Sequence, residues 1–255
     1  MVGNASDRPT AVLIHGLSEE RRVWERQVSA FADTMNVIAY DVRGFGTSPT
    51  GAADGTVRQM ADDLAQVLSA MDTGPVWLVG FSMGGVISQR FALDFAEMTA
   101  GLVLIASSCV VGRAGVTFFR ERLEQVERGG LSALGAINTE DARGCIGNGD
   151  EALIAEYQEL RIRAVRDPAG YLNAGRAMLR LREEPIIQDL CSIRKPTLVV
   201  TGELDPYCPP KASEMIAEAI PESELRTIPN AGHCMHWEET GATNELVSGF
   251  IHGHG

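Results

Sequence analysis

The chain has 255 residues, of which 45% are hydrophobic and 22% are charged, the balance of one large globular α/β domain with a sizeable core. Its net charge of −12 argues against nucleic acid as a partner, because binding to phosphates needs a clustered basic surface. No apolar run reaches the length of a membrane span, so we expect no association with a membrane.

The amino terminus has no basic segment followed by an apolar core, so we expect no signal peptide and a cytoplasmic location. The five cysteines are odd in number and form no CxxC pair, which favours free thiols in a reducing compartment. The histidines and cysteines lack the spacing of a metal site, and no glycine-rich phosphate loop occurs, so we expect no metal and no cofactor. The sequence leaves open whether the chain forms a homo-oligomer.

Apolar runs of strand length alternate with helical patterns along most of the chain. Five runs nearly continuous in valine, leucine and isoleucine predict parallel strands buried on both faces. A sixth run at 225–230 is more polar, which indicates a strand nearer the edge of the sheet. The alternation predicts an α/β fold with a mostly parallel central sheet covered by helices. The five clearest runs cover 11–16, 37–41, 76–80, 102–107 and 197–202, and the predicted helices cover 19–33, 56–71, 83–96, 209–219 and 238–251.

Residues 112–190 interrupt this alternation, because they contain helical patterns and no convincing strand. One crossover between strands needs far fewer residues. We therefore expect a helical cap at 112–190, inserted after the strand at 102–107 into a core formed by 1–111 and 191–255.

The predicted cap is rich in arginine and glutamate. We expect a solvated helix face on which these charges balance, and the alternative is that one arginine binds a substrate carboxylate. The arginines concerned are Arg161, Arg163, Arg166, Arg176, Arg180 and Arg182.

The segment GFSMGG places Ser82 directly after a buried strand and before a helical pattern. A GxSxG pattern between a strand and a helix is typical of a strained turn that exposes a serine nucleophile. Gly80 and Gly84, two positions before and after the serine, avoid steric clashes in such a turn. The first N–H groups of the helix face the same point and suit a developing oxyanion. An ordinary turn without chemistry is the alternative.

A serine nucleophile needs a base, and histidine is the usual one. His252 and His254 lie in the last four residues, and His15 lies far upstream at the end of the first strand. His233 and His236 remain, directly after the last predicted strand. The sequence around His233 favours it as the base, with His236 as the alternative.

The base in turn needs an acidic group that orients it. Asp205 lies in a loop just beyond the strand at 197–202, and Glu203 and Asp41 also lie near strand ends. The order Ser82, Asp205, His233 places each residue at the carboxyl end of a strand, where open α/β sheets bind ligands.

These motifs resemble those of the α/β-hydrolase superfamily along nearly the whole chain. The resemblance implies Ser82 as nucleophile, His233 as general base and then acid, and Asp205 as the residue that orients His233. It also implies an oxyanion hole formed by the main-chain N–H groups of Leu17 and Met83. The matching segments are HGL (15–17), DVRGFGTS (41–48), GFSMGG (80–85), GELDPYCPP (202–210) and NAGHCMHWEE (230–239).

The predicted cap and the carboxyl-terminal part look most like 3-oxoadipate enol-lactonases and small carboxylesterases. This resemblance implies cleavage of a small carboxylic ester or lactone through an acyl-enzyme. One alternative is a carbon–carbon bond hydrolase of ring-cleavage diketones, which often carries a tryptophan where Trp237 stands. Another is a small-molecule binding protein without turnover. Residues expected either to line an apolar pocket or to fill the core are Trp24, Phe118, Phe119, Met178 and Trp237.

Overall fold

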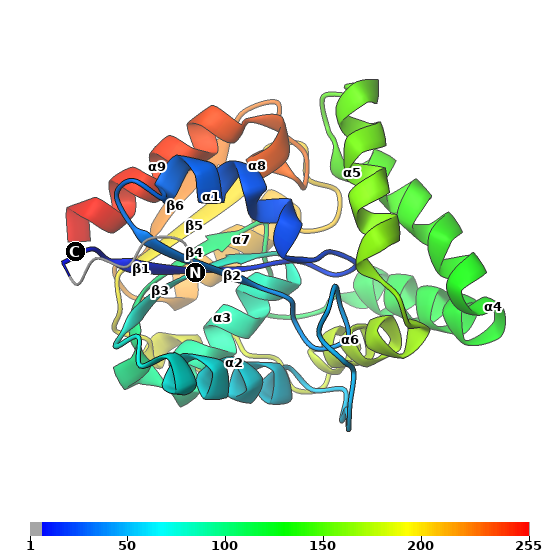
Figure 1. Cartoon of the computed structure of the whole chain (residues 1–255), viewed down its shortest axis with the longest axis horizontal. Coiled ribbons are helices and arrows are strands. Elements are labelled where there is room, and N and C mark those ends of the chain that lie inside the picture. The colour runs from blue at the N-terminus through cyan, green and yellow to red at the C-terminus, as the bar shows by residue number, and fades with distance from the viewer. Residues whose placement is uncertain (1–6, 255) are drawn as a thin grey trace.

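The computed structural model describes residues 7–254 (Figure 1). Within these residues, six parallel strands form one sheet in the order β2-β1-β3-β4-β5-β6. The parallel sheet is therefore confirmed, and the polar sixth strand lies at one edge as predicted. The strands are β1 (Thr10–Ile14), β2 (Asn36–Tyr40), β3 (Val76–Phe81), β4 (Thr99–Ile105), β5 (Thr197–Gly202) and β6 (Glu224–Ile228).

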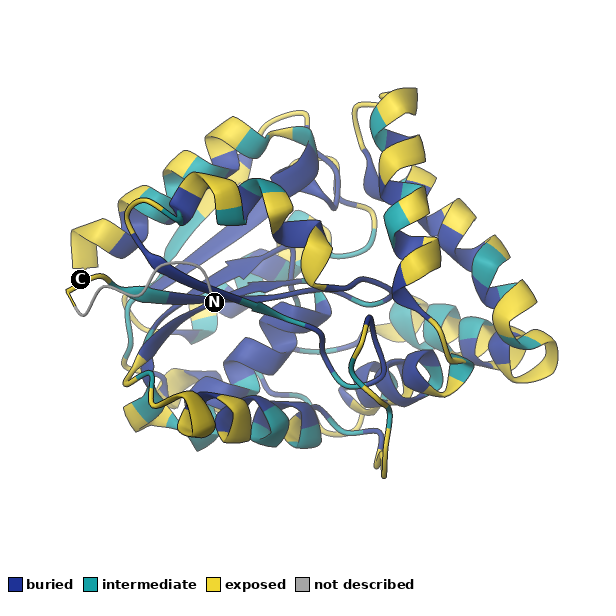
Figure 2. Ribbon diagram, in the orientation of Figure 1, coloured by how far each residue is buried: buried dark blue, intermediate teal, exposed yellow. Residues whose placement is uncertain are grey.

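Alternate residues of a strand enter two hydrophobic clusters, one on each face of the sheet. Figure 2 shows the strands largely buried between helices whose outer faces are exposed. On β1, Val12 and Ile14 belong to the cluster that includes α2 (Val57–Met71), α3 (Met83–Asp94) and α7 (Pro210–Ala219). Ala11 and Leu13 belong to the cluster that includes α1 (Glu25–Phe31) and α9 (Thr240–His254). Burial on both faces explains why the strands are nearly continuous in apolar residues.

Several predicted boundaries are wrong by a few residues. The helix predicted at 19–33 is a short 3-10 helix, η1 (Arg21–Trp24), followed by α1. The helix predicted at 238–251 is two helices, α8 (Met235–Glu238) and α9, because Glu239 leaves the helical conformation with φ −116° and ψ 53°. Two further 3-10 turns are η2 (Ala96–Met98) and η3 (Leu190–Ser192). No helix in the described part of the chain has the length and apolar character needed to cross a bilayer.

Three long helices lie between β4 and β5, and we call them the cap helices: α4 (Arg113–Cys145), α5 (Glu151–Ala164) and α6 (Pro168–Arg180). Figure 1 shows them together at one end of the sheet. Helix α4 is bent at Gly130, whose φ of 56° and ψ of −139° favour glycine. Asp150 and Asp167 begin α5 and α6 as N-caps, since their carboxylates accept hydrogen bonds from the first N–H groups of each helix.

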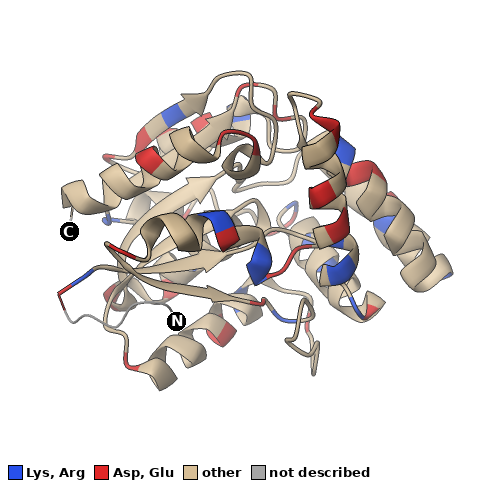
Figure 3. Ribbon diagram, turned by 45° about the horizontal axis from the view of Figure 1, so that its top comes forward, with Lys and Arg blue, Asp and Glu red and all other residues tan. Residues whose placement is uncertain are grey.

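Acidic and basic residues are interspersed on the cap helices (Figure 3). Arg163 pairs with Glu159, and Arg176 pairs with Glu127, between side chains that are about half exposed or more. These pairs match the predicted solvated face. Arg161 departs from that prediction, because it is only 5% exposed and faces the interior.

Candidate active site

Ser82 lies at a sharp turn between β3 and α3. Its φ of 52° and ψ of −116° are strained for a residue with a Cβ. The turn depends on close backbone contacts. A Cβ at Gly80 would lie 2.4 Å from the carbonyl oxygen of Gly84, and one at Gly84 would lie 2.0 Å from that of Ile14. The two glycines therefore allow α3 to pack closely enough to present the serine hydroxyl.

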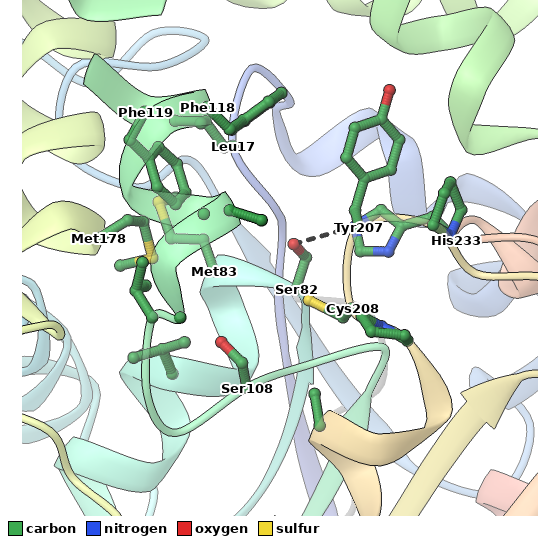
Figure 4. Close-up of a pocket in the computed structure, with 18 of the residues that line it drawn as sticks. Leu17, Ser82, Met83, Ser108, Phe118, Phe119, Met178, Tyr207, Cys208 and His233 are labelled. Carbon is green, nitrogen blue, oxygen red and sulfur yellow. Dashed lines mark hydrogen bonds between the residues drawn. The ribbon is translucent and has the colours of Figure 1, made fainter. Parts of the chain in front are cut away.

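The side chains of Ser82, His233 and Asp205 form a continuous hydrogen-bonded chain. His233 Nε2 lies 3.1 Å from Ser82 Oγ, the contact drawn in Figure 4, and His233 Nδ1 lies 2.8 Å from Asp205 Oδ2. Asp205 Oδ1 accepts the N–H groups of Tyr207 and Cys208 at 2.8 and 2.9 Å. Because the carboxylate accepts the proton on Nδ1, Nε2 is left to accept the serine proton.

The electrostatics around His233 favour its charged form. Burial disfavours a charge on the ring, but the charge and hydrogen bond of Asp205, with help from Cys145 and Glu19, raise the pKa of His233 to about 9. A base that must hold a proton while an anionic intermediate exists benefits from such a shift.

The alternative acids, Glu203 and Asp41, and the alternative base, His236, form no hydrogen bond with Ser82, His233 or Asp205 among the described residues. His236 is fully buried between the rings of Trp24 and Phe81, and neither of its ring nitrogens has a hydrogen-bond partner among the described residues. Burial, followed by the charge of His233, lowers the pKa of His236 to about 3. Glu203 accepts a backbone N–H at 2.9 Å, and Asp41 accepts the backbone N–H of Thr47 at 2.9 Å. Asp41 also accepts hydrogen bonds from the side chains of Arg21 and Thr47. Within residues 7–254, neither carboxylate has a hydrogen bond to a histidine.

Two main-chain N–H groups near the serine have no acceptor among the described residues. Met83 begins α3, so its N–H belongs to the first turn, which has no intrahelical acceptor. His15 Nε2 accepts the N–H of Val42 at 2.9 Å, so its proton is on Nδ1, which donates to the Gly16 carbonyl at 2.8 Å. In a trans peptide the N–H points away from the C=O of the same peptide. Because the Gly16 carbonyl faces His15 Nδ1, the Leu17 N–H points away from the His15 ring. Leu17 and Met83 both line the cavity described next.

A cavity of about 720 Å³ opens beside Ser82, between the cap helices and the carboxyl ends of the strands. The predicted pocket residues Phe118, Phe119 and Met178 line it. Figure 4 shows Phe119 and Met178 on the side of Ser82 opposite His233, whereas the Phe118 ring packs edge-on against Tyr207. Most of its wall is apolar. A polar region occurs where α4 and α5 meet the loop after β1, and it includes Asp141, Cys145 and Arg161.

Trp24 and Trp237 do not line this cavity, so their assignment to the pocket is corrected. Both belong to the hydrophobic cluster that contains α1 and α9. Trp24 is fully buried against His236, and Trp237 Nε1 donates to the Val23 carbonyl at 2.9 Å. Their large apolar rings fill the core on that face of the sheet.

Sequence reasoning missed two buried polar residues next to the candidate site, Glu19 and Tyr157, and it expected Arg161, which is also buried there, on a solvated helix face. Glu19 follows the HGL motif by two positions, and an acidic residue beside a predicted oxyanion loop was a usable signal. Tyr157 and Arg161 are four positions apart, which places them on one face of a helix. That spacing does not reveal which part of the chain the face contacts.

The titratable groups of residues 7–254 contain no cluster of three or more His, Cys, Asp and Glu side chains able to hold a metal ion. All five cysteines lie in this range and are free thiols.

Comparisons with known proteins agree with this architecture. RutD of Agrobacterium fabrum, a protein named for carbamate hydrolysis, is 28% identical over 96% of this chain and 94% of its own. 3-Oxoadipate enol-lactonase 2 of Acinetobacter baylyi is 26% identical over 95% of this chain and 88% of its own. A solved thermophilic esterase from Thermogutta terrifontis has a TM-score of 0.86 at 26% identity, covering 99% of this chain and 92% of that one. A family model for the alpha/beta hydrolase fold matches residues 9–240, and the protein therefore belongs to the alpha/beta hydrolase family.

Proposed function

We propose that the protein is a serine hydrolase that cleaves a small carboxylic ester or lactone through an acyl-enzyme intermediate. The observation that carries this proposal is the connected geometry of Ser82, His233 and Asp205, at 3.1 and 2.8 Å, beside an open cavity. Membership of a hydrolase family supports the reaction class.

The proposed reaction begins when His233 Nε2 takes the proton of Ser82 Oγ as that oxygen attacks the substrate carbonyl carbon. The carbonyl oxygen becomes an oxyanion that accepts the N–H groups of Leu17 and Met83. One such donor is worth about 3–4 kcal/mol in the transition state. When the intermediate collapses, the carbon–oxygen bond breaks and His233 gives its proton to the leaving oxygen.

The second half of the reaction uses water as the nucleophile. His233 removes a proton from the water as it attacks the acyl-enzyme, and returns that proton to Ser82 Oγ when the acid leaves. With a lactone, the leaving oxygen stays attached to the acyl group, so one ring-opened product is released. Asp205 keeps Nδ1–H of His233 engaged throughout and stabilises the imidazolium.

The cavity supports a small substrate with an apolar group. Its volume of about 720 Å³ is within the range of small-molecule sites, roughly 300–1,000 Å³. Phe118, Phe119 and Met178 on its wall favour a hydrocarbon acyl or alcohol group. The ring of Trp237, the feature that suggested a carbon–carbon bond hydrolase, is in the core and not in this cavity.

The test is a burst experiment with p-nitrophenyl acetate, butyrate and octanoate, followed by simple lactones. Nitrophenolate is a good leaving group, so acylation should be faster than deacylation, and the wild-type protein should release one nitrophenolate per chain rapidly and then turn over steadily. Ser82→Ala should abolish both phases. Ser108→Ala is the matched control, since Ser108 lines the same cavity but, among the described residues, forms no hydrogen bond with His233, and it should keep both.

A burst without later turnover would favour the small-molecule binding protein over the enzyme. Steady turnover that survives in Ser82→Ala would contradict the proposed nucleophile.

A further inference from the structure

The loop between β1 and η1, residues 15–20, carries the Leu17 N–H, and we call it the oxyanion loop. Glu19 of this loop is fully buried. Its Oε2 accepts the Gly16 N–H at 2.7 Å, and its Oε1 accepts the hydroxyl of Tyr157 from cap helix α5. Burial raises the pKa of Glu19, and the charge of Arg161 and these hydrogen bonds act in the opposite direction. The buried carboxylate thus relies on cap residues as partners.

Arg161, one turn after Tyr157 on α5, reaches the same loop. Its Nη1 donates to the Leu17 carbonyl and to the Tyr157 hydroxyl, both at 3.3 Å. Its Nη2 lies 3.4 Å from Asp141 Oδ2. A buried guanidinium is unfavourable unless such partners surround it. Arg161 therefore ties a cap helix to the oxyanion loop.

The two peptides that flank Leu17 are then restrained on both sides. The Gly16 carbonyl accepts His15 Nδ1–H, and the Leu17 carbonyl accepts Arg161 Nη1. The Leu17 N–H lies in the same peptide plane as the Gly16 carbonyl, and the Leu17 carbonyl lies in the next plane, which is joined to the first through the φ and ψ of Leu17. Of these two restraints, the first comes from the core and the second comes from the cap.

We propose that Arg161 is a positioning residue for the oxyanion hole: through the Leu17 carbonyl, and supported by Tyr157 and Glu19, it keeps the Leu17 N–H directed at the substrate oxygen. This inference rests on the proposed serine hydrolase function. Oxyanion donors act mainly on the transition state, so loss of Arg161 should lower kcat with little change in KM. Loss of a cap residue that only bound substrate would raise KM and leave kcat little changed.

The experiment compares Arg161→Met with a control variant, Arg163→Met. Arg163 lies on the same helix, but its guanidinium pairs with Glu159 on the outer face. The readouts are kcat and KM for a p-nitrophenyl ester, and inhibition by two ligands. A trifluoromethyl ketone of matching chain length adds to Ser82 and forms an oxyanion, whereas the product carboxylic acid does not.

For Arg161→Met we expect kcat and affinity for the ketone to fall about 10- to 100-fold, because small displacements of catalytic groups have effects of this size. KM and affinity for the acid should stay within about threefold, since neither depends on the oxyanion donor. Arg163→Met should match the wild type in kcat, in KM and in its affinity for both the ketone and the acid. Asp141 keeps Arg122 at 3.0 Å in the variant, which limits the damage to the fold.

Two milder variants decide the matter if Arg161→Met does not fold. Arg161→Lys keeps a hydrogen-bond donor and should recover part of the kcat lost in Arg161→Met. Tyr157→Phe should lower kcat by less than Arg161→Met does, again with little change in KM. Equal behaviour of Arg161 and Arg163 variants, or losses confined to KM, would overturn the inference. An inactive wild-type protein would instead contradict the proposed function itself.

Discussion

The strand-end loops and the cap helices contribute to the candidate site in different ways. Ser82, Asp205 and His233 each follow a different strand, and short local motifs place them at the carboxyl edge of one sheet. The cap helices contribute through long-range side-chain contacts, such as Arg161 with Leu17, across 144 positions of sequence. The reacting groups are thus placed by local sequence motifs, whereas their surroundings are set by long-range packing.

A second junction between cap and core lies beside His233. Glu238 accepts the N–H of Gly232 at 2.9 Å from the core, and those of Gly147 and Asn148 at 2.9 and 3.0 Å from the loop after α4. The Cys234 N–H also donates to the Cys145 carbonyl at 3.0 Å. The cap helices therefore contact the loops of both the candidate base and the candidate oxyanion donor.

The largest effect should come from the strand-end loops. Ser82→Ala, His233→Ala and the double variant should each lose about 10⁴- to 10⁶-fold in kcat, with no further loss in the double variant because the two residues act as a unit. Steady-state kinetics with one p-nitrophenyl ester measure this. Losses that multiply in the double variant would contradict a shared proton transfer.

Asp205→Asn should lower kcat by about 10⁴-fold while leaving the protein folded. The asparagine oxygen can still accept the N–H groups of Tyr207 and Cys208, which directs its NH₂ group toward His233 Nδ1. That arrangement moves the imidazole proton to Nε2, where it cannot accept from serine. Circular dichroism checks the fold, and near-normal activity would show that Asp205 does not orient the base.

The pH dependence should report His233 directly. Since its pKa is raised from 6.5 to about 9 and only the neutral ring is a base, kcat/KM should rise with pH and level off above about 9. The same shift stabilises the fold below pH 6.5, and that contribution should be lost as pH rises through about 9. A profile that is already flat at pH 7 would contradict the raised pKa.

The same substitution made in the two regions should have opposite effects. Gly84→Ala places a Cβ 2.0 Å from the Ile14 carbonyl oxygen and should destabilise the fold by about 2–4 kcal/mol, with loss of activity. Gly135→Ala in α4 meets nothing within 4 Å and should stabilise that helix by about 0.5–1 kcal/mol. Urea unfolding of both variants measures the difference, and equal stabilities would show that the turn between β3 and α3 tolerates a side chain at position 84.

The smallest effect should come from the outer face of the cap helices. Arg176→Gln breaks an ion pair with Glu127 whose side chains are 54% and 49% exposed. Such surface pairs contribute little to stability, so the free energy of unfolding should change by less than about 1 kcal/mol and kcat by less than about twofold. A loss comparable to that of Arg161→Met would mean that the whole cap surface, and not the Arg161 contact, controls the site.

The sequence was sufficient for the sheet, the family and the set of residues brought together at its edge. Buried strands have a simple apolar signature. Gly80 is required by a contact with Gly84, four residues away, and Gly84 is required by a contact with Ile14 at the end of the neighbouring strand. The pocket was only partly predictable: Phe119 and Met178 line it, but Trp24 and Trp237 do not, because an aromatic residue suits a core as well as a cavity. Arg161 was misplaced because helical spacing does not say which side of α5 meets the core.

The assignment of Ser82 as the nucleophile can be tested directly by the intact mass of the protein after reaction with a fluorophosphonate probe, with peptide mapping of the adduct. We predict one adduct per chain, on Ser82, absent from Ser82→Ala and His233→Ala and unchanged in Ser108→Ala. No adduct on the folded wild-type protein, or an adduct on another residue, would contradict it.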